Sequence, residues 1–209
     1  MACGETTLQL LDEARRLRGT ASLAVSGGST PKPMLESMSA QPFDWNSIEV
    51  FQVDERCVPP EHHLSNYRMI RQALSAPSTI HRMRGELPGS QAVALYEEEM
   101  GDIEFDVIQR GMGADGHTAS LFPGLPLPCS KSGLVGTVWV PSVRQDRITL
   151  MPRVLERARV TLCLVTGPEK ADALHAVLRG VRDTKLWPAQ ISSPVMMWFI
   201  DEAAAAKLQ

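Results

Sequence analysis

The segment Ser22–Pro31, SLAVSGGSTP, joins a short apolar run to two glycines and a hydroxyl-rich turn. The apolar run has the length of one strand, and we expect that strand to be buried. A helix is expected to begin near Pro31, because proline fits the first turn of a helix. A strand, a glycine turn and a helix in this order are typical of an α/β protein.

The same alternation continues along the chain. Further strands are expected at Ile48–Val53, Ile80–Met83, Phe105–Gln109, Leu134–Val140, Arg147–Leu150, Val160–Thr166 and Pro194–Ile200. Helices are expected at Ser65–Leu74 (with Ser65 as N-cap), Gln91–Met100, Glu169–Leu178 and Asp201–Lys207. We therefore predict an α/β fold with a mostly parallel twisted, Rossmann-like sheet and helices on both faces. No linker or repeat divides the chain, so residues 1–209 are expected to form a single domain.

The composition argues against several classes of protein. The net charge is -3, so no overall basic field would attract nucleic acid or an anionic membrane. Aromatic residues make up 5%, which leaves little material for stacking single-stranded bases. The N-terminal stretch carries charges where a signal peptide needs an apolar run. We expect a cytoplasmic protein, a monomer or weak homodimer, with neither nucleic-acid nor membrane partners.

Cysteine and histidine spacing gives no sign of a metal site. The four cysteines match no zinc pattern and are too few for a disulfide framework in this chain: Cys3, Cys57, Cys129 and Cys163. His62 and His63 are adjacent, so they do not share a helix face as metal ligands do. Cys57 lies in a candidate site loop, where it is either a reactive thiol or, as isolated thiols usually are, a small apolar residue.

The loop after the first strand has features of a phosphate site. Gly27 and Gly28 let a ligand approach the backbone, and the helix N-terminus offers free N–H groups. Ser29 and Thr30 add hydroxyl donors. The loop matches neither G-x-x-x-x-G-K-[ST] nor G-x-G-x-x-G. A simple strand-to-helix turn therefore stays an alternative.

A second group of charged residues directly follows the strand at Ile48–Val53. Asp54, Glu55 and Arg56 stand at this strand end, and Asn66 lies downstream. Ligands of such sheets bind at the carboxyl ends of the strands. Arg56 has the planar fork that binds anions, although a solvated charge cluster is the alternative.

The third loop, Gly111–Gly124, is the most informative. It sets His117 two residues after Asp115 among several glycines, directly after a strand. Histidine titrates near neutral pH, which suits a general base, and a carboxylate can orient its ring. A lone histidine is usually structural, but the glycines, the strand end and the carboxylate of Asp115 two residues away favour a catalytic role for His117.

Two further cations are candidates for binding an anion. Lys170 lies in the first turn of a predicted helix, where a cation is unfavourable unless an anion is bound. Arg147, with Arg144 nearby, adds positive charge at another strand. Each is otherwise a surface cation.

Seven segments together resemble one family. They are SGGSTPKP, VDERCVPP, SNYRM, HRMRGE, GMGADGHTASLFPG, QDRITL and LVTGPEKADAL, in this order. The chain resembles the 6-phosphogluconolactonases of the pentose phosphate pathway from about Leu23 to Ile200. Arg110 stands where that family usually has an apolar residue, so we expect this strand end to be exposed or ion-paired. The segment before the first strand is short, so we expect part of the family's first helix to be missing.

The resemblance implies a fold related to glucosamine-6-phosphate deaminase and ribose-5-phosphate isomerase. The implied substrate is 6-phospho-D-glucono-1,5-lactone, hydrolysed without metal or organic cofactor. His117 would be the general base, oriented by Asp115, and Arg56 would bind substrate or the developing oxyanion. The remaining substrate-binding residues would be Gly27, Gly28, Ser29, Thr30, Asp54, Asn66, Gly113, Arg147 and Lys170.

Two other functions compete with this one. Amino-sugar phosphate deaminases resemble the chain at the glycine loop and at the Asp-Glu and Asp-Gly-His segments. They usually place an aromatic residue where Arg56 stands and follow the histidine with a different run. A non-catalytic phosphosugar sensor would keep the phosphate loop but lose the base, whereas His117 is present.

Overall fold

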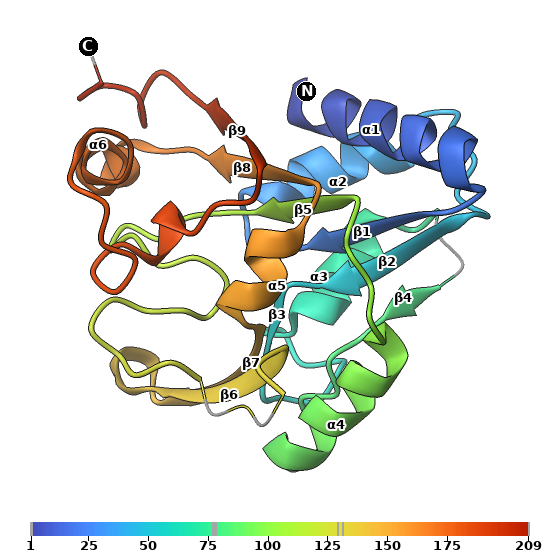
Figure 1. Ribbon diagram of the computed structural model, residues 1–209, viewed down its shortest axis with the longest axis horizontal. Helices are drawn as coiled ribbons and strands as arrows, with labels where there is room; N and C mark the ends of the chain where they lie inside the picture. The colour runs from blue at the N-terminus through green and yellow to red at the C-terminus, as the bar shows by residue number, and fades with distance from the viewer. Residues whose placement is uncertain (1, 77–78, 129, 131, 209) are drawn as a thin grey trace.

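The computed structural model describes residues 2–76, 79–128, 130 and 132–208. Its main feature is a six-stranded sheet in the order β4-β2-β1-β5-β8-β9, with all neighbouring strands parallel. The strands are β1 Ala21–Val25, β2 Ile48–Gln52, β4 Ile80–His81, β5 Val107–Arg110, β8 Val160–Val165 and β9 Val195–Ile200. The predicted mostly parallel sheet is confirmed (Figure 1).

A second, antiparallel sheet of three strands lies beside the first. Its order is β3-β7-β6, with β3 Asp54–Arg56, β7 Gln145–Leu150 and β6 Val135–Val140. Val53 joins the two sheets, because its amide donates to Val25 and its carbonyl accepts from Leu150. Strands near β6 and β7 are expected from the sequence, whereas Asp54–Arg56 is polar and is expected to be part of a loop; its pairing with β7 makes it a strand instead.

Helices cover both faces of the main sheet, as predicted (Figure 1). One face carries the helices α1 Ala2–Arg18, α2 Pro31–Ser39 and α3 Asn66–Ala73. The other face carries α4 Gly89–Met100 and α5 Pro152–Arg157, and α6 Ala171–Arg179 follows β8. Ser65 caps α3 as predicted, since its hydroxyl accepts from the amide of Arg68 at 3.1 Å.

Three local expectations were incomplete or wrong. A helix of 17 residues, α1, precedes the first strand, and neither it nor α5 was derived from the pattern. Residues 202–207 form turns rather than the expected terminal helix. Arg110 is 0% exposed and has no acidic partner within ion-pair distance among the described residues, so the expectation of an exposed or paired side chain is wrong.

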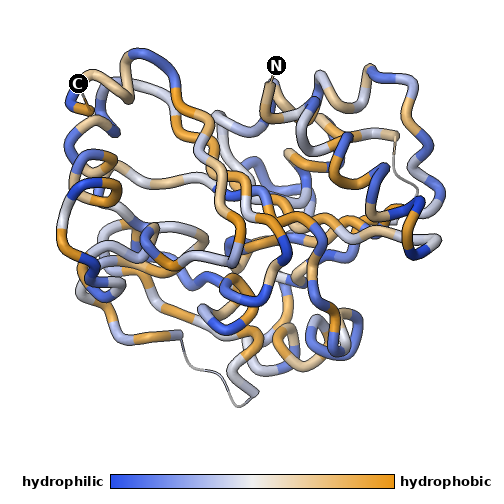
Figure 2. The backbone as a smooth tube through the Cα atoms, turned by 45° about the horizontal axis from the view of Figure 1, so that its top comes forward, coloured by the Kyte–Doolittle hydropathy of each residue, from blue (hydrophilic) through white to orange (hydrophobic). Residues whose placement is uncertain are grey.

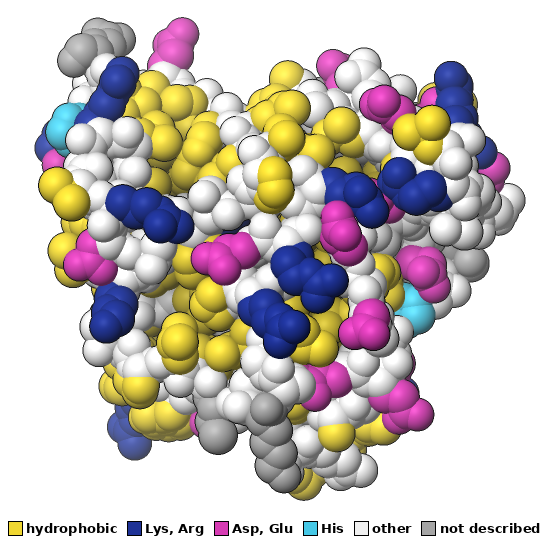
Figure 3. All heavy atoms as spheres, viewed as in Figure 1, with side chains coloured by type: hydrophobic (Ala, Val, Ile, Leu, Met, Phe, Trp, Pro, Cys, Tyr) yellow, Lys and Arg dark blue, Asp and Glu magenta, His cyan; other side chains and the backbone are white. Residues whose placement is uncertain are grey.

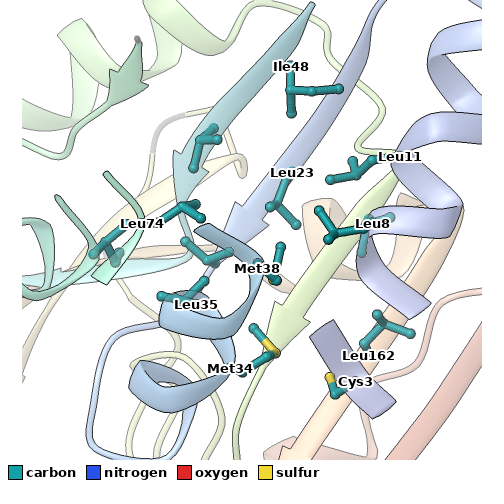
Figure 4. Packing of buried hydrophobic residues seen from close by; sticks show 14 of the residues in the cluster. Cys3, Leu8, Leu11, Leu23, Met34, Leu35, Met38, Ile48, Leu74 and Leu162 are labelled. Carbon is teal, nitrogen blue, oxygen red and sulfur yellow. The ribbon is translucent and has the colours of Figure 1, made fainter. Parts of the chain in front are cut away.

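The two faces of the sheet form separate apolar cores. Leu23 and Val25 point into the core under α1 and α2, and Ala24 between them points to the other side. Figure 4 shows the first core, in which Leu8 and Leu11 of α1 meet Leu23. Strands covered on both faces are mostly apolar, and orange segments run through the middle of the tube in Figure 2, although β2 contains Glu49 and β5 ends in Gln109 and Arg110.

Strand β9 is the exception, since it forms one edge of the sheet. Its side chains remain partly exposed: 43% for Val195, 38% for Met197 and 36% for Ile200.

Apolar side chains gather near the top of Figure 3, whereas acidic and basic side chains are interspersed over the rest of that face. On the face that is drawn, charges of both signs therefore alternate.

The strand order creates one special position. From β1 the chain proceeds outward to β2 and β4, and from β5 it proceeds in the opposite direction to β8 and β9. The loops at the carboxyl ends of β1 and β5 therefore lead the chain in opposite directions. Such a reversal leaves a crevice in which open α/β sheets bind their ligands.

Candidate active site

A polar cleft of about 220 Å³ occupies this crevice. Eleven of the twelve predicted site residues line it: Gly27, Gly28, Ser29, Thr30, Asp54, Arg56, Asn66, Gly113, His117, Arg147 and Lys170. The twelfth, Asp115, is not part of the wall but is bonded to His117. Residues scattered over 144 positions of the sequence are therefore gathered around one small volume.

The loop between β1 and α2 forms a wall made largely of backbone. Gly28 has a φ of +113°, a conformation that side-chain-bearing residues rarely adopt. A Cβ on Gly27 would lie 1.9 Å from Oδ1 of Asn66, so only glycine fits there. Thr30 precedes α2 and makes no side-chain cap. Because Pro31 and Pro33 lack an N–H, Lys32 is the one of the first three helix residues whose amide can bind an anion.

The adjacent residues Asp54 and Glu55 have different surroundings. Asp54 faces the cleft, and its Oδ2 accepts from the hydroxyl of Ser120 at 2.7 Å. Glu55 is 1% exposed and points away, toward the start of α3. Its carboxylate accepts hydrogen bonds from five donors: Gln52 Nε2, Arg56 N, Ser65 Oγ, Asn66 N and Tyr67 N. These hydrogen bonds hold Arg56 and Asn66, two residues that line the cleft, in place.

Arg56 and Arg147 are directly paired across β3 and β7. Both line the cleft, and the Nε atom of each is buried without a hydrogen-bond partner. Burial lowers the pKa of Arg147; Asp54 opposes this effect, and the charge of Arg56 adds to it. Like charges placed opposite each other repel, so a negative charge bound between Arg56 and Arg147 would relieve the repulsion.

Lys170 lines another part of the cleft, and its Nζ lies 3.8 Å from Oε1 of the exposed Glu169. It ends a short 3₁₀ helix, Pro168–Lys170, and starts α6. Thr166 stands on the same loop, with its hydroxyl 3.3 Å from the hydroxyl of Thr30. The side chains of Lys170, Thr166 and Thr30 therefore lie together with the glycine loop.

The loop after β5 holds His117 in a defined turn. The amide of Gly113 donates to the carbonyl of His117 at 2.8 Å, and Gly116 has a φ of +82°. A Cβ on Gly113 would lie 2.0 Å from Nδ1 of His117. The ring of Phe122 covers the imidazole, with 4.3 Å between ring centroids. The side chain of His117 is 31% exposed and lines the cleft.

Four polar residues of the cleft region were not predicted from the sequence. Ser26, Thr118 and Thr166 line the wall, and Ser120 donates a hydrogen bond to Asp54. Thr118 and Ser120 belong to the Gly111–Gly124 loop, and both are buried with their hydroxyls hydrogen-bonded, Thr118 to the carbonyl of Gly111 and Ser120 to Asp54. Short hydroxyl residues in a glycine-rich loop were the available signal.

No metal cluster accompanies the cleft. Among the described residues, no group of three or more His, Cys, Asp or Glu side chains is arranged to hold an ion. His62 and His63 stack on each other instead, with 4.2 Å between centroids. Cys3, Cys57 and Cys163 are free, and Cys129 lies outside the described residues.

No helix in the described part of the chain is long and apolar enough to cross a membrane.

Comparison with known proteins identifies the family of this chain. The family model described as glucosamine-6-phosphate isomerases/6-phosphogluconolactonase matches residues 1–198. The chain belongs to this family. The match to the family model confirms the resemblance that the seven sequence segments carry.

Several relatives of this family carry one name. The chain is 37% identical to the 6-phosphogluconolactonase of Pseudomonas aeruginosa over 83% of its length and 77% of that protein. It is 35% identical to the 6-phosphogluconolactonase of Synechocystis over 92% of its length and 86% of that protein. The crystal structure of 6-phosphogluconolactonase from Thermotoga maritima matches with a TM-score of 0.84 at 30% identity, covering 94% of this chain and 92% of that one.

Proposed function

We propose that this chain hydrolyses 6-phospho-D-glucono-1,5-lactone to 6-phosphogluconate in the oxidative pentose phosphate pathway. The observation that carries the proposal is the cleft itself. It joins a histidine that is bonded to a carboxylate with an arginine pair on one side and a single lysine, Lys170, on another. Its relatives named 6-phosphogluconolactonase support the same substrate.

His117 acts as the general base. Its Nδ1 faces Oδ1 of Asp115 at 2.5 Å, which favours the tautomer with the proton on Nδ1. Nε2 then carries the free lone pair. It takes a proton from water as the water oxygen bonds to the lactone carbonyl carbon. The bond from that carbon to the ring oxygen then breaks, and the ring oxygen receives the proton from Nε2.

The arginine pair and Lys170 divide the substrate between them. The carbonyl oxygen becomes an oxyanion in the first step, and Arg56 is placed at the cleft to stabilise it. The phosphate binds at Lys170 together with Gly27, Gly28, Ser29 and Thr30. The hydroxyls of Ser29 and Thr30, the Lys170 ammonium and the amide of Lys32 are donors that suit a dianion. Asp54, Asn66, Gly113 and Arg147 complete the wall around the sugar hydroxyls.

The amino-sugar deaminase alternative predicts a different reaction. The arginine pair Arg56 and Arg147 favours an acidic product, since hydrolysis of the lactone creates a carboxylate. A substrate comparison separates the two: acid release from 6-phosphogluconolactone and ammonia release from glucosamine 6-phosphate, with the same purified protein. We expect only acid release. Ammonia release without lactone hydrolysis would overturn the proposal.

The remaining expectations concern the state of the protein. We propose that residues 1–209 act as one domain, as a monomer or weak homodimer in the cytoplasm, without nucleic-acid or membrane partners. Free, largely buried thiols at Cys3 and Cys163 are in keeping with a reducing compartment. Sedimentation velocity across a concentration series tests the assembly state. A stable higher oligomer at every concentration would contradict it.

A further inference from the structure

Arg110 is an unusual buried cation at the end of β5, directly before the loop that carries His117. Its side chain is 0% exposed and is among the largest fully buried side chains described. No carboxylate lies within ion-pair distance of it in the described part of the chain. Burying a guanidinium is costly unless hydrogen bonds satisfy it, so its acceptors indicate what it does.

Its partners belong to the His117 loop, to the segment that ends at Ile191, and to the neighbouring strands β8 and β9, where Cys163 and Met196 lie beside it. Nη2 donates to the carbonyl of Ile191 and contacts the sulfur of Met196 at 3.8 Å. Nη1 lies 3.5 Å from Oγ1 of Thr118. That hydroxyl in turn donates to the carbonyl of Gly111 at 2.8 Å. Arg110 therefore connects both ends of the turn that contains His117 to the segment that ends at Ile191.

The same segment, residues 183–191, contacts the His117 loop at further points. The amide of Ala189 donates to the carbonyl of Gly116 at 3.0 Å. Trp187 packs against Gly116 so closely that a Cβ there would lie 2.5 Å from the indole ring. Trp187, Ala189 and Arg110 therefore all contact the loop that carries His117.

We propose that Arg110 is a positioning residue for the reaction. It acts through Thr118, the residue after His117, and through Ile191, and it keeps the imidazole aimed into the cleft. This inference rests on the proposed lactonase function for its kinetic consequence. Its structural consequence, a loop that loosens when the guanidinium is removed, does not depend on the substrate.

The test compares Arg110→Met with wild type and with Arg18→Met. Methionine reproduces the unbranched apolar stem of arginine but removes the guanidinium and its donors. Arg18 pairs with Asp106, beside the opposite end of β5, and supplies the matched control. Small displacements of a catalytic group cost up to about 10²-fold in rate, so kcat of Arg110→Met is expected to fall by about that factor with KM changed less than about twofold. Arg18→Met is expected to lose thermal stability with kcat retained.

A second variant tests the path. Thr118→Val removes the hydroxyl and leaves Arg110 in place. If both act as one unit, the double variant Arg110→Met/Thr118→Val loses little more kcat than Arg110→Met alone, because coupled residues are non-additive. Independent, additive losses would overturn the route through Thr118. Thr118→Val also tests this path if Arg110→Met does not fold.

Amide hydrogen exchange provides a readout that survives failure of the lactonase assignment. The amides of Gly113, Gly116, Thr118 and Leu121 are bonded within the loop. They are expected to exchange faster in Arg110→Met than in wild type or Arg18→Met, with α2 unchanged. Unchanged loop exchange and unchanged kcat, together with a lower melting temperature, would reduce Arg110 to a stability residue and overturn the proposal.

Discussion

Oδ1 of Asp115 holds both the ring and the backbone of His117, at 2.5 Å from Nδ1 and 3.1 Å from the amide nitrogen. Burial would raise the pKa of Asp115, but the hydrogen bonds and charge of His117 outweigh it and lower the pKa below its usual value. One carboxylate oxygen thereby sets the position of the imidazole and its tautomer.

We expect Asp115→Asn to fold and to lose most of its activity. An amide at this position can present its NH2 group to Nδ1, which then accepts and leaves the proton on Nε2, the wrong tautomer for a base. The kcat is expected to fall by about 10²-fold or more, within the range that general-base catalysis supplies. Single-turnover acid release measures the chemical step, and a kcat near that of wild type would contradict the role.

The same pair gives a pH dependence of stability. Because the pKa of Asp115 is lower in the folded protein than in the unfolded chain, its ionised form stabilises the fold above the unfolded pKa. That contribution is lost as pH falls through the folded pKa. The effect is small, since the side chain is 53% exposed. Urea unfolding is expected to separate wild type from Asp115→Ala at pH 6 and to bring the two together toward strong acid; a gap that widens there would have the wrong sign.

Gly113 is expected to tolerate no side chain. A Cβ would lie 2.0 Å from Nδ1 of His117, so Gly113→Ala must displace the imidazole. Gly111→Ala is the matched control, because its Cβ meets only the carbonyl of Leu164, at 3.6 Å. Steady-state kinetics should show a loss of kcat for Gly113→Ala at least about tenfold greater than for Gly111→Ala, as expected for a misplaced catalytic group. Equal losses would mean that the loop adapts.

Glu55 is expected to matter for stability. In the wild type the Glu55 carboxylate accepts from N–H and O–H donors. In Glu55→Gln an NH2 group faces some of these donors and leaves them without an acceptor, which should lower the free energy of unfolding by about 1–3 kcal/mol. Glu61→Gln, on the exposed part of the same connection, serves as the control. Chemical denaturation measures both variants. A loss below that of Glu61→Gln would show that α3 does not depend on this carboxylate.

Cys57 is expected to be unreactive at neutral pH. Burial, followed by the negative charges of Asp146 and Glu55, raises the pKa of its thiol to about 11. Only the thiolate is nucleophilic, so alkylation at pH 7.5 should be far slower than for a free cysteine and should accelerate toward pH 11. Peptide mass spectrometry after iodoacetamide treatment follows the site. Rapid modification at pH 7.5 would support the reactive alternative.

The sequence predicted those parts of the fold that depend on local pattern. Buried strands such as Val160–Val165 carry an unbroken apolar run, and Ser65 caps its helix through its own hydroxyl. It did not predict β3, because Asp54–Arg56 is polar and its strand character comes from pairing with β7, some 90 residues away. Arg110 was misjudged for a similar reason. Its acceptor at Ile191 is distant in sequence, so nothing nearby indicates that a charge can be buried there.

The candidate site followed the same division. Gly27, Gly28, Asp115 and His117 stand in loops whose chemistry is visible in the sequence. The opposition of Arg56 and Arg147 is not visible, because it depends on the register of two strands. Sequence reasoning also left the separate orientations of Asp54 and Glu55 open. Alternation along β3 sends one side chain to the cleft and the other to α3.

The central claim is that His117 drives hydrolysis of the phosphosugar lactone. The most direct measurement follows acid release from freshly prepared 6-phosphogluconolactone at neutral pH, with spontaneous hydrolysis subtracted. It compares wild type, EDTA-treated wild type, His117→Ala and His175→Ala, which alters an exposed histidine of α6. We predict acceleration by wild type, EDTA-treated wild type and His175→Ala, and its loss in folded His117→Ala. Acceleration that persists in His117→Ala, or none in folded wild type, would contradict the account.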